Sequence, residues 1–171
     1  MSKYMKFARE KVRETLDALH MTDLYYSINI SFSNRMTRAA GCAECIMQPS
    51  GEATDLRIKF SNKLFDRMTM EEKVNTIIHE TCHIVCYFLD GDNGKGHKKN
   101  WKDAMKKAGV SNPNRCHNVN RDGLRRKQKR YRAACDCRDN IELSGIRRKR
   151  ILNHGYVYRC VKCNGKIRLS E

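Results

Sequence analysis

The chain has 171 residues, which allows one domain with a substantial core, or a modest domain with a small appendage. Neither a secretory signal nor a run of 18 apolar residues is present, so we expect a cytoplasmic protein with no membrane partner. Nine cysteines without a secretory signal indicate reduced thiols rather than a disulfide framework. The composition therefore argues against a secreted or membrane-spanning protein.

Positive charge is concentrated in the last third of the chain. Of the net charge of +16, about +12 comes from residues 111–171, which contain 17 Lys and Arg against 5 Asp and Glu. Such an electropositive segment favours a polyanion partner, most often nucleic acid, because neutralised phosphates release their condensed counterions. A solvated basic surface that serves only solubility is the alternative.

The first part of the chain predicts a helix followed by a meander of strands. Apolar residues recur at intervals of three and four over 3–19, as in an amphipathic surface helix. Strands are predicted over 27–33, 41–47 and 55–60, the last two forming a hairpin around the turn at 49–51. We therefore expect helices packed on a small antiparallel sheet.

A long central helix is predicted from Thr69, which opens a capping box with Glu72, to about Leu89. Its core stripe should comprise Val74, Ile77, Ile78, Cys82, Val85, Phe88 and Leu89. The opposite face carries Thr76, His79, Glu80, His83 and Tyr87. The two histidines belong to the pentapeptide His79-Glu80-Thr81-Cys82-His83 and lie one helical turn apart. These histidines should face a cleft.

An H-E-x-x-H helix suits two imidazoles that bind one metal ion beside a general base. Catalytic zinc takes three protein ligands and keeps a fourth position for water, and the best candidate for the third ligand is His97. His97 ends a glycine-rich loop over 90–98, which is followed by a shorter helix over 98–108. Glu80 would take a proton from the attacking water and pass it to the leaving amine.

Beyond Ser111 the composition becomes basic and cysteine-rich, which suggests domains at 1–110 and 111–171 with strands near 148–153 and 156–159. Four thiolates that suit a tetrahedral structural zinc come from Cys135, Cys137, Cys160 and Cys163. His154 in place of one thiolate is the main alternative. A further C-x-x-C pair, Cys42 and Cys45, favours packing in a strand over a redox pair or half of another zinc knuckle.

Taken together, these motifs resemble the SprT family of zinc metalloproteins. The resemblance rests on the pentapeptide, on Gly96-His97 followed by Trp101 and Met105, on Arg38-Ala39-Ala40-Gly41, and on the cysteine pairs. It implies a zincin-like catalytic domain with a zinc-ribbon appendage, related to the Spartan proteases that degrade DNA-crosslinked proteins. It also implies catalytic zinc on His79, His83 and His97, with Glu80 as base. Lys98 departs from the glycine that the family commonly has after the third histidine.

The leading hypothesis is a monomeric zinc endopeptidase that acts on DNA-bound or DNA-crosslinked proteins, with DNA, including single-stranded regions, held by basic side chains. The expected phosphate contacts are Arg125, Arg126, Lys127, Lys129, Arg130, Arg147, Arg148, Lys149 and Arg150. Tyr131, Tyr156 and Tyr158 would stack on unpaired bases. The main alternative is a DNA-binding or regulatory zinc protein without proteolysis, and a hydrolase of small amides is a weaker third option.

Overall fold

The computed structural model describes residues 2–114, 119–124 and 128–170. The chain forms two compact units, Met1–Arg125 and Arg126–Glu171, and both contain helices and strands. This confirms the α+β class. Of the described residues, none lies in a helix long and apolar enough to cross a membrane.

The first unit extends past the boundary that the sequence suggested near Ser111. Val119 and Leu124 pack against its hydrophobic core. The backbone between them is held by Arg67, whose Nη1 donates to the carbonyl oxygens of Asn120 (3.4 Å) and Asp122 (2.7 Å). Residues 119–124 are therefore part of the first unit, while the division into domains 1–110 and 111–171 stays a prediction.

The sheet of the first unit is mixed, so the predicted antiparallel meander is wrong. β1 (Ile28–Ser33), β2 (Gly41–Met47) and β3 (Ala53–Ser61) lie in the order β1-β3-β2. β2 and β3 form the expected antiparallel hairpin, but β1 pairs with β3 in parallel.

The parallel pairing of β1 with β3 is possible because the connection between β1 and β2 passes over the position of one strand. Strands in a sheet lie about 4.8 Å apart, so the connection must span about 10 Å, a distance that seven residues cover easily. It is fastened to the end of β3, where Ser61 donates from its amide to Ala40 O (2.9 Å) and from Oγ to Met36 O (2.7 Å). Sequence periodicity alone does not show which neighbour a strand selects.

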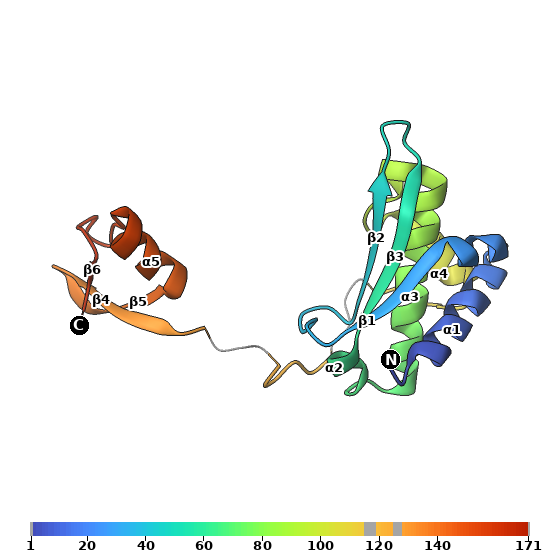
Figure 1. The fold of residues 1–171 in the computed structure, drawn as a ribbon, viewed down its shortest axis with the longest axis horizontal. Coiled ribbons are helices and arrows are strands. Elements are labelled where there is room, and N and C mark those ends of the chain that lie inside the picture. The colour runs from blue at the N-terminus through green and yellow to red at the C-terminus, as the bar shows by residue number, and fades with distance from the viewer. Residues whose placement is uncertain (1, 115–118, 125–127, 171) are drawn as a thin grey trace. The chain divides into compact units, whose positions relative to one another are not determined.

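Helices α1 (Met5–Ala18) and α3 (Met70–Asp90) cover one face of this sheet (Figure 1). Their apolar side chains form one core with those of the strands, and Leu16, Ile58, Phe60 and Ile77 are among its fully buried members. The unit also contains three short elements: η1 (Thr22–Ser27), α2 (Asn62–Phe65) and η2 (Gly91–Gly94).

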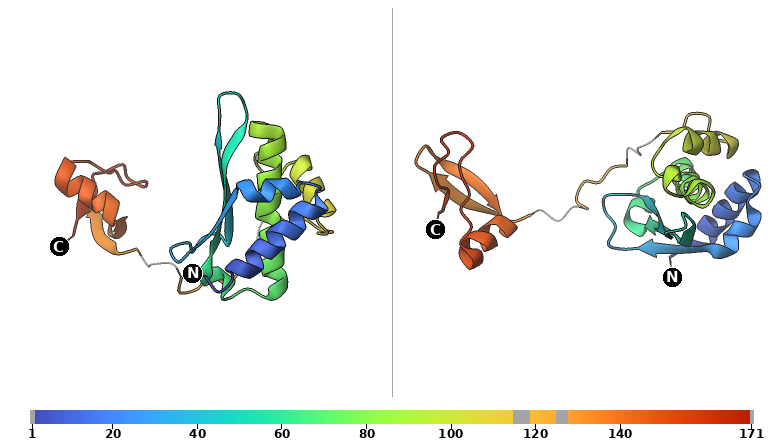
Figure 2. Two further views of the ribbon diagram at one scale, coloured as in Figure 1. Left: turned by 45° about the vertical axis from the view of Figure 1, so that its right-hand side comes forward. Right: turned by 90° about the horizontal axis from the view of Figure 1, so that it is seen from above.

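Helix α4 (Lys99–Lys107) packs on α3 away from the sheet, as Figure 2 shows. Because α3 lies between two layers, it is buried on more than one face, and Ile84 and Cys86 join its buried residues. The expected core positions Phe88 and Leu89 are instead 46% and 62% exposed. They lie on sides of the last turn that neither layer covers.

Helix α3 begins as predicted. Thr69 Oγ1 accepts a hydrogen bond from Glu72 N (3.2 Å), and the Glu72 carboxylate accepts one from Thr69 N (2.8 Å). The helix ends at Gly91, whose φ is +53°. A side chain there would collide with the carbonyl oxygen of Gly51 in the β2–β3 turn, at 2.5 Å. The end of α3 and the hairpin tip are thus in close contact.

The second unit is a small sheet with one helix. β4 (Arg130–Cys135), β5 (Arg138–Ser144) and β6 (Arg168–Leu169) form an antiparallel sheet in the order β5-β4-β6, and α5 (Gly145–His154) follows β5. Its core is small, with six buried residues that include two cysteines: Ala133, Cys135, Ile141, Leu143, Cys160 and Ile167.

Two strand predictions for this unit are wrong. Residues 148–153 lie in α5, and residues 156–159 form no strand beyond an isolated bridge between Arg159 and Lys166. Arg, Lys and Leu are good helix formers, and Ser144 caps the helix by accepting a hydrogen bond from Arg147 N (3.4 Å).

Candidate functional site

Three histidines meet in the first unit. His79 and His83 lie on one face of α3, and Gly96, whose φ is +85°, turns the loop after η2 so that His97 reaches them. The three Nε2 atoms form a nearly equilateral triangle with sides of 3.2, 3.2 and 3.1 Å. His79 and His83 are each 5% exposed, and His97 is half-buried.

This triangle fits a metal ion. Four ligands placed tetrahedrally at zinc–nitrogen distances of about 2.0 Å would be spaced about 3.3 Å apart, close to the observed separations. Burial, and then the proximity of His97, lower the pKa of His83 to about 4. His83 is therefore neutral at pH 7, as a metal ligand must be.

Trp101 of α4 supports all three rings. Its ring centroid lies 4.7, 5.4 and 4.5 Å from those of His79, His83 and His97, respectively. Its Nε1 donates a hydrogen bond to the backbone oxygen of His79 (3.3 Å). The side chain is fully buried. The buried indole ring of Trp101 thus packs against all three histidine rings.

Glu80 lies next to the histidines and is only 6% exposed. Burial raises the pKa of its carboxyl to about 7, although a hydrogen bond from the backbone of Ala43 in β2 acts in the opposite direction. Gly41 contacts the same carboxylate, and a Cβ at that position would lie 2.5 Å from Glu80 Cγ. The carboxylate is therefore held between α3 and the edge of the sheet.

A cavity of about 350 Å³ adjoins the cluster. Its walls comprise Arg38, Ala39, Ala40, Gly41, Cys42, Ala43, Leu64, His79, Glu80, His83, Tyr87, His97, Val119 and Arg121. Tyr87 stacks on His83, with ring centroids 5.9 Å apart and planes at 19°. Arg38 and Arg121 are not predicted from the sequence to line this cavity, since no spacing rule links either residue to α3.

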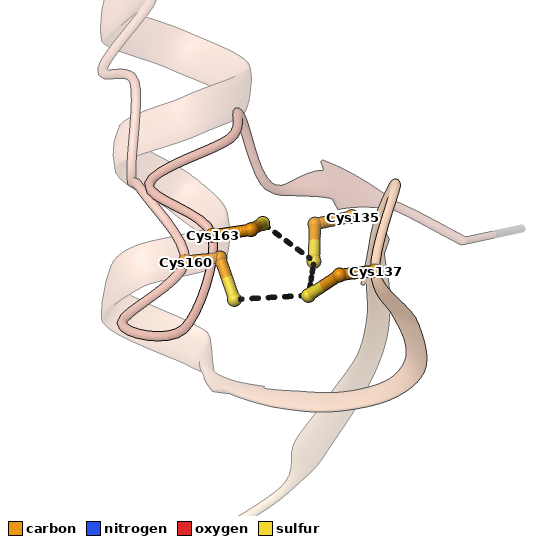
Figure 3. A group of neighbouring side chains, drawn as sticks. All are labelled: Cys135, Cys137, Cys160 and Cys163. Carbon is orange, nitrogen blue, oxygen red and sulfur yellow. Dashed lines mark hydrogen bonds between the residues drawn. The ribbon is translucent and has the colours of Figure 1, made fainter.

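Four cysteines form a second cluster, in the second unit (Figure 3). Cys135 Sγ lies 3.2 Å from Cys137 Sγ and 3.8 Å from Cys163 Sγ, and Cys137 Sγ lies 3.7 Å from Cys160 Sγ. Tetrahedral zinc with bonds of about 2.3 Å to sulfur spaces its ligands about 3.8 Å apart, so this set also fits a metal. His154, the alternative ligand, is exposed at the end of α5 and does not belong to the cluster.

Cys42 and Cys45 lie on β2 and are both half-buried. Burial raises the pKa of both thiols, that of Cys42 to about 11. Cys45 packs against the main core. The pair thus suits packing better than redox chemistry, which needs an accessible thiolate.

Four of the expected DNA contacts lie on α5. Arg147, Lys149 and Arg150 are exposed on the helix, and Arg148 is half-exposed. Cations lie over the three tyrosines: Arg148 over Tyr131 (4.7 Å), Lys129 over Tyr131 (5.4 Å), Arg147 over Tyr158 (5.4 Å) and Arg150 over Tyr156 (5.8 Å). Arg130 is exposed at the start of β4. Arg125, Arg126 and Lys127 lie outside the described residues.

The sequence model of the SprT-like family matches residues 8–121, two thirds of the chain. The chain belongs to the SprT-like family. This confirms the resemblance found in the sequence, and the matched range contains the three histidines, Glu80 and the cavity beside them. It ends before the cysteine cluster.

Proteins named Protein SprT are similar to this SprT-like chain. The one from Pseudomonas putida is 29% identical over 106 residues, which are 62% of this chain and 63% of the relative. One from Pseudomonas fluorescens is 27% identical over the same shares, and one from Shewanella oneidensis is 26% identical over 67% of this chain and 70% of the relative. The alignments with the first two span less than two thirds of each relative.

Proposed function

We propose that this protein is a zinc-dependent endopeptidase that acts on DNA-bound or DNA-crosslinked proteins. The first unit would be a zincin-like catalytic domain and the second a zinc ribbon. The observation that carries the proposal is the triangle of three histidine Nε2 atoms, with sides of 3.1–3.2 Å, beside the buried carboxylate of Glu80.

His79, His83 and His97 would hold the zinc, which when bound polarises a carbonyl and lowers the pKa of water. Glu80 then takes the proton that the attacking water loses and gives it to the amine that leaves. Burial raises the pKa of this carboxyl above its ordinary value, which makes it a stronger base for the proton that it accepts. The contacts with Gly41 and Ala43 hold this carboxylate in place during both transfers.

The substrate would bind along β2. This strand lies at one edge of the sheet, and Gly41, Cys42 and Ala43 line the cavity beside the histidines. An edge strand offers backbone amide and carbonyl groups that an extended peptide can pair with. A polypeptide aligned on β2 would therefore pass beside Glu80.

The basic side chains of the second unit would bind DNA. Helix α5 carries Arg147, Arg148, Lys149 and Arg150 within one turn, and Lys129 and Arg130 precede or begin β4. Such charges bind phosphates without sequence preference. Because three of the four cations on α5 lie over tyrosines, each could contact a phosphate while its tyrosine contacts a base.

The test is cleavage of a protein crosslinked to a DNA oligonucleotide, followed by gel electrophoresis, with zinc-loaded wild type, Glu80→Gln and the exposed control Glu52→Gln. The proposal expects cleavage by wild type and Glu52→Gln and none by Glu80→Gln, with equal DNA binding by all three. If all three bind DNA and none cleaves, the protein is instead a DNA-binding or regulatory zinc protein.

A further inference from the structure

Two arginines, Arg38 and Arg121, line the cavity that also contains the three histidines and Glu80. Both side chains are exposed, so they can meet a molecule that enters. Neither forms an ion pair with another residue in the described ranges. Two exposed arginines that form no ion pair within these ranges thus line the cavity beside the histidines.

Hydrogen bonds to backbone carbonyl oxygens hold both segments that carry these arginines. Arg38 lies in the connection between β1 and β2, which Ser61 holds through hydrogen bonds to Met36 O and Ala40 O. Arg121 lies between Asn120 and Asp122, whose carbonyl oxygens both accept hydrogen bonds from Arg67. The two arginines are therefore presented from anchored backbone.

Positive charge also lies beyond His97. A second cavity, of about 510 Å³, shares His97 with the first and is lined by Gly96, Lys98, Trp101, Lys102 and Pro113. Of the described residues that line either cavity, Glu80 is the only one with a carboxylate, and it is buried. The two cavities that meet at His97 thus carry four cations and one buried acid.

We propose that the site selects peptide segments that carry acidic side chains beside the bond to be cut. Arg38 and Arg121 bind a substrate carboxylate in the first cavity, and Lys98 and Lys102 bind another in the second. A guanidinium pairs with a carboxylate through two parallel hydrogen bonds, which gives arginine a geometric preference for this group. The inference rests on the proposed peptidase function, because it concerns what enters the same cleft.

A DNA phosphate could supply the same negative charge, but the walls of the first cavity favour a peptide. They include the backbone of β2 at the edge of the sheet and apolar side chains of Leu64 and Val119. Alternating amide and carbonyl groups match a peptide backbone, and a phosphodiester chain has no donors to pair with the carbonyls. The cation-rich helix for DNA lies in the second unit.

The test is binding of fluorescein-labelled peptides with capped ends to zinc-loaded Glu80→Gln protein, measured by fluorescence anisotropy. One peptide carries Asp and Glu on both sides of its central bond, and its partner carries Asn and Gln instead. We expect the acidic peptide to bind about tenfold more tightly, and Arg38→Gln and Arg121→Gln to weaken it about fivefold each. Arg35→Gln, in the same connection but outside the cavity, should change nothing.

Equal binding of both peptides, or an affinity that is unchanged in both arginine variants, would overturn the inference. A short oligothymidylate provides a further test. If it displaces the labelled peptide in a way that depends on Arg38 and Arg121, while peptide charge has no effect, the arginines bind phosphate and the inference is overturned. Cleavage of the same peptides by wild type separates the two proposals. Equal cleavage of the two peptides would refute the selection of acidic segments but not the peptidase function. Charge-selective binding without any cleavage would refute the peptidase function but not the preference for acidic peptides.

Discussion

Gly41 on β2 and Glu80 on α3 are in direct contact, so that a Cβ at position 41 would lie 2.5 Å from Glu80 Cγ and 2.7 Å from Oε1. Contacts this close leave no room for a methyl group unless the carboxylate moves. The backbone of the edge strand and the carboxylate thus pack closely against each other.

Gly41→Ala should lower kcat by about 10- to 100-fold, because displacing a catalytic group by about 1 Å costs rate on this scale. Zinc content should stay the same, because Gly41 is not one of the residues that could bind the metal ion. Gly145→Ala is the control, because a Cβ there meets only Tyr131 at an ordinary 3.6 Å. Steady-state kinetics with metal analysis would measure both, and unchanged kcat in Gly41→Ala would show that Glu80 is not held by this contact.

Burial of Glu80 should make the metal-free protein less stable as pH rises. Its carboxyl titrates near 4.5 when unfolded and near 7 when folded, so between these values the folded state holds a proton that the unfolded state has released. Glu80→Gln lacks this effect and should be more stable than wild type at pH 8, by up to about 3 kcal/mol, and similar to it at pH 4.5. His83, whose pKa is lowered and whose contribution to stability is lost as pH falls below 6.5, is present in both proteins.

Urea unfolding followed by fluorescence of Trp101, the single tryptophan, reports on the first unit alone. Glu52→Gln is the control, because Glu52 is exposed and should leave the pH profile of stability as in wild type. Parallel profiles for wild type and Glu80→Gln would contradict the proposed burial effect.

Removing metal should unfold the second unit and spare the first. Two of the six buried residues in the second unit's core are cysteines of the cluster, so little apolar burial would be left without the metal. In NMR spectra of the full chain, a chelator or Cys160→Ser should collapse the amide signals of residues 130–169 into the unfolded range. Cys45→Ser, a cysteine outside the cluster, should not. Dispersed signals for β4 and β5 without metal would refute this account.

Arg67→Ala should loosen the backbone of residues 119–124, because Arg67 donates to the carbonyl oxygens of both Asn120 and Asp122. Hydrogen exchange measured by mass spectrometry should become faster in this segment, and binding of the acidic peptide should weaken along with it. The exposed neighbour Lys63 provides a control through Lys63→Ala. Unchanged exchange in Arg67→Ala would mean that the apolar contacts of Val119 and Leu124 suffice to hold the segment.

DNA affinity should depend on α5. Replacing Arg147 and Arg150 together by Gln should reduce the slope of log K against log salt by about 1.5, because each lost phosphate contact removes about 0.7–0.9. The control pair, Lys59→Gln with Lys63→Gln, changes the net charge equally but lies in the first unit. Titrations of single-stranded and duplex DNA at several salt concentrations would compare them, and equal slopes for the two double variants would exclude a specific role of α5.

Local sequence patterns predict much of helix α3. The capping box at Thr69 and Glu72 and the spacing of His79 and His83 are properties of one helix, and short-range rules describe these well. The sequence also indicates His97 as the third histidine, although its approach depends on the positive φ of Gly96.

Long-range relationships were not predictable in the same way. The parallel pairing of β1 with β3 depends on a connection that bypasses a strand, and the burial of α3 on two sides depends on α4. Arg121 reaches the cavity through contacts of Arg67 with backbone more than 50 residues away. The sequence predicts a strand over 148–153 where the structure has helix α5, because the charged residues there obscure any apolar period.

The most direct test of the central claim is metal content by mass spectrometry on wild type, His83→Ala and Cys160→Ser, with cleavage of the crosslinked protein measured on the same samples. We predict two zinc ions per wild-type chain and one in each variant, with no cleavage by His83→Ala. One zinc ion in both wild type and His83→Ala, with equal activity, would contradict a catalytic zinc centre on His79, His83 and His97.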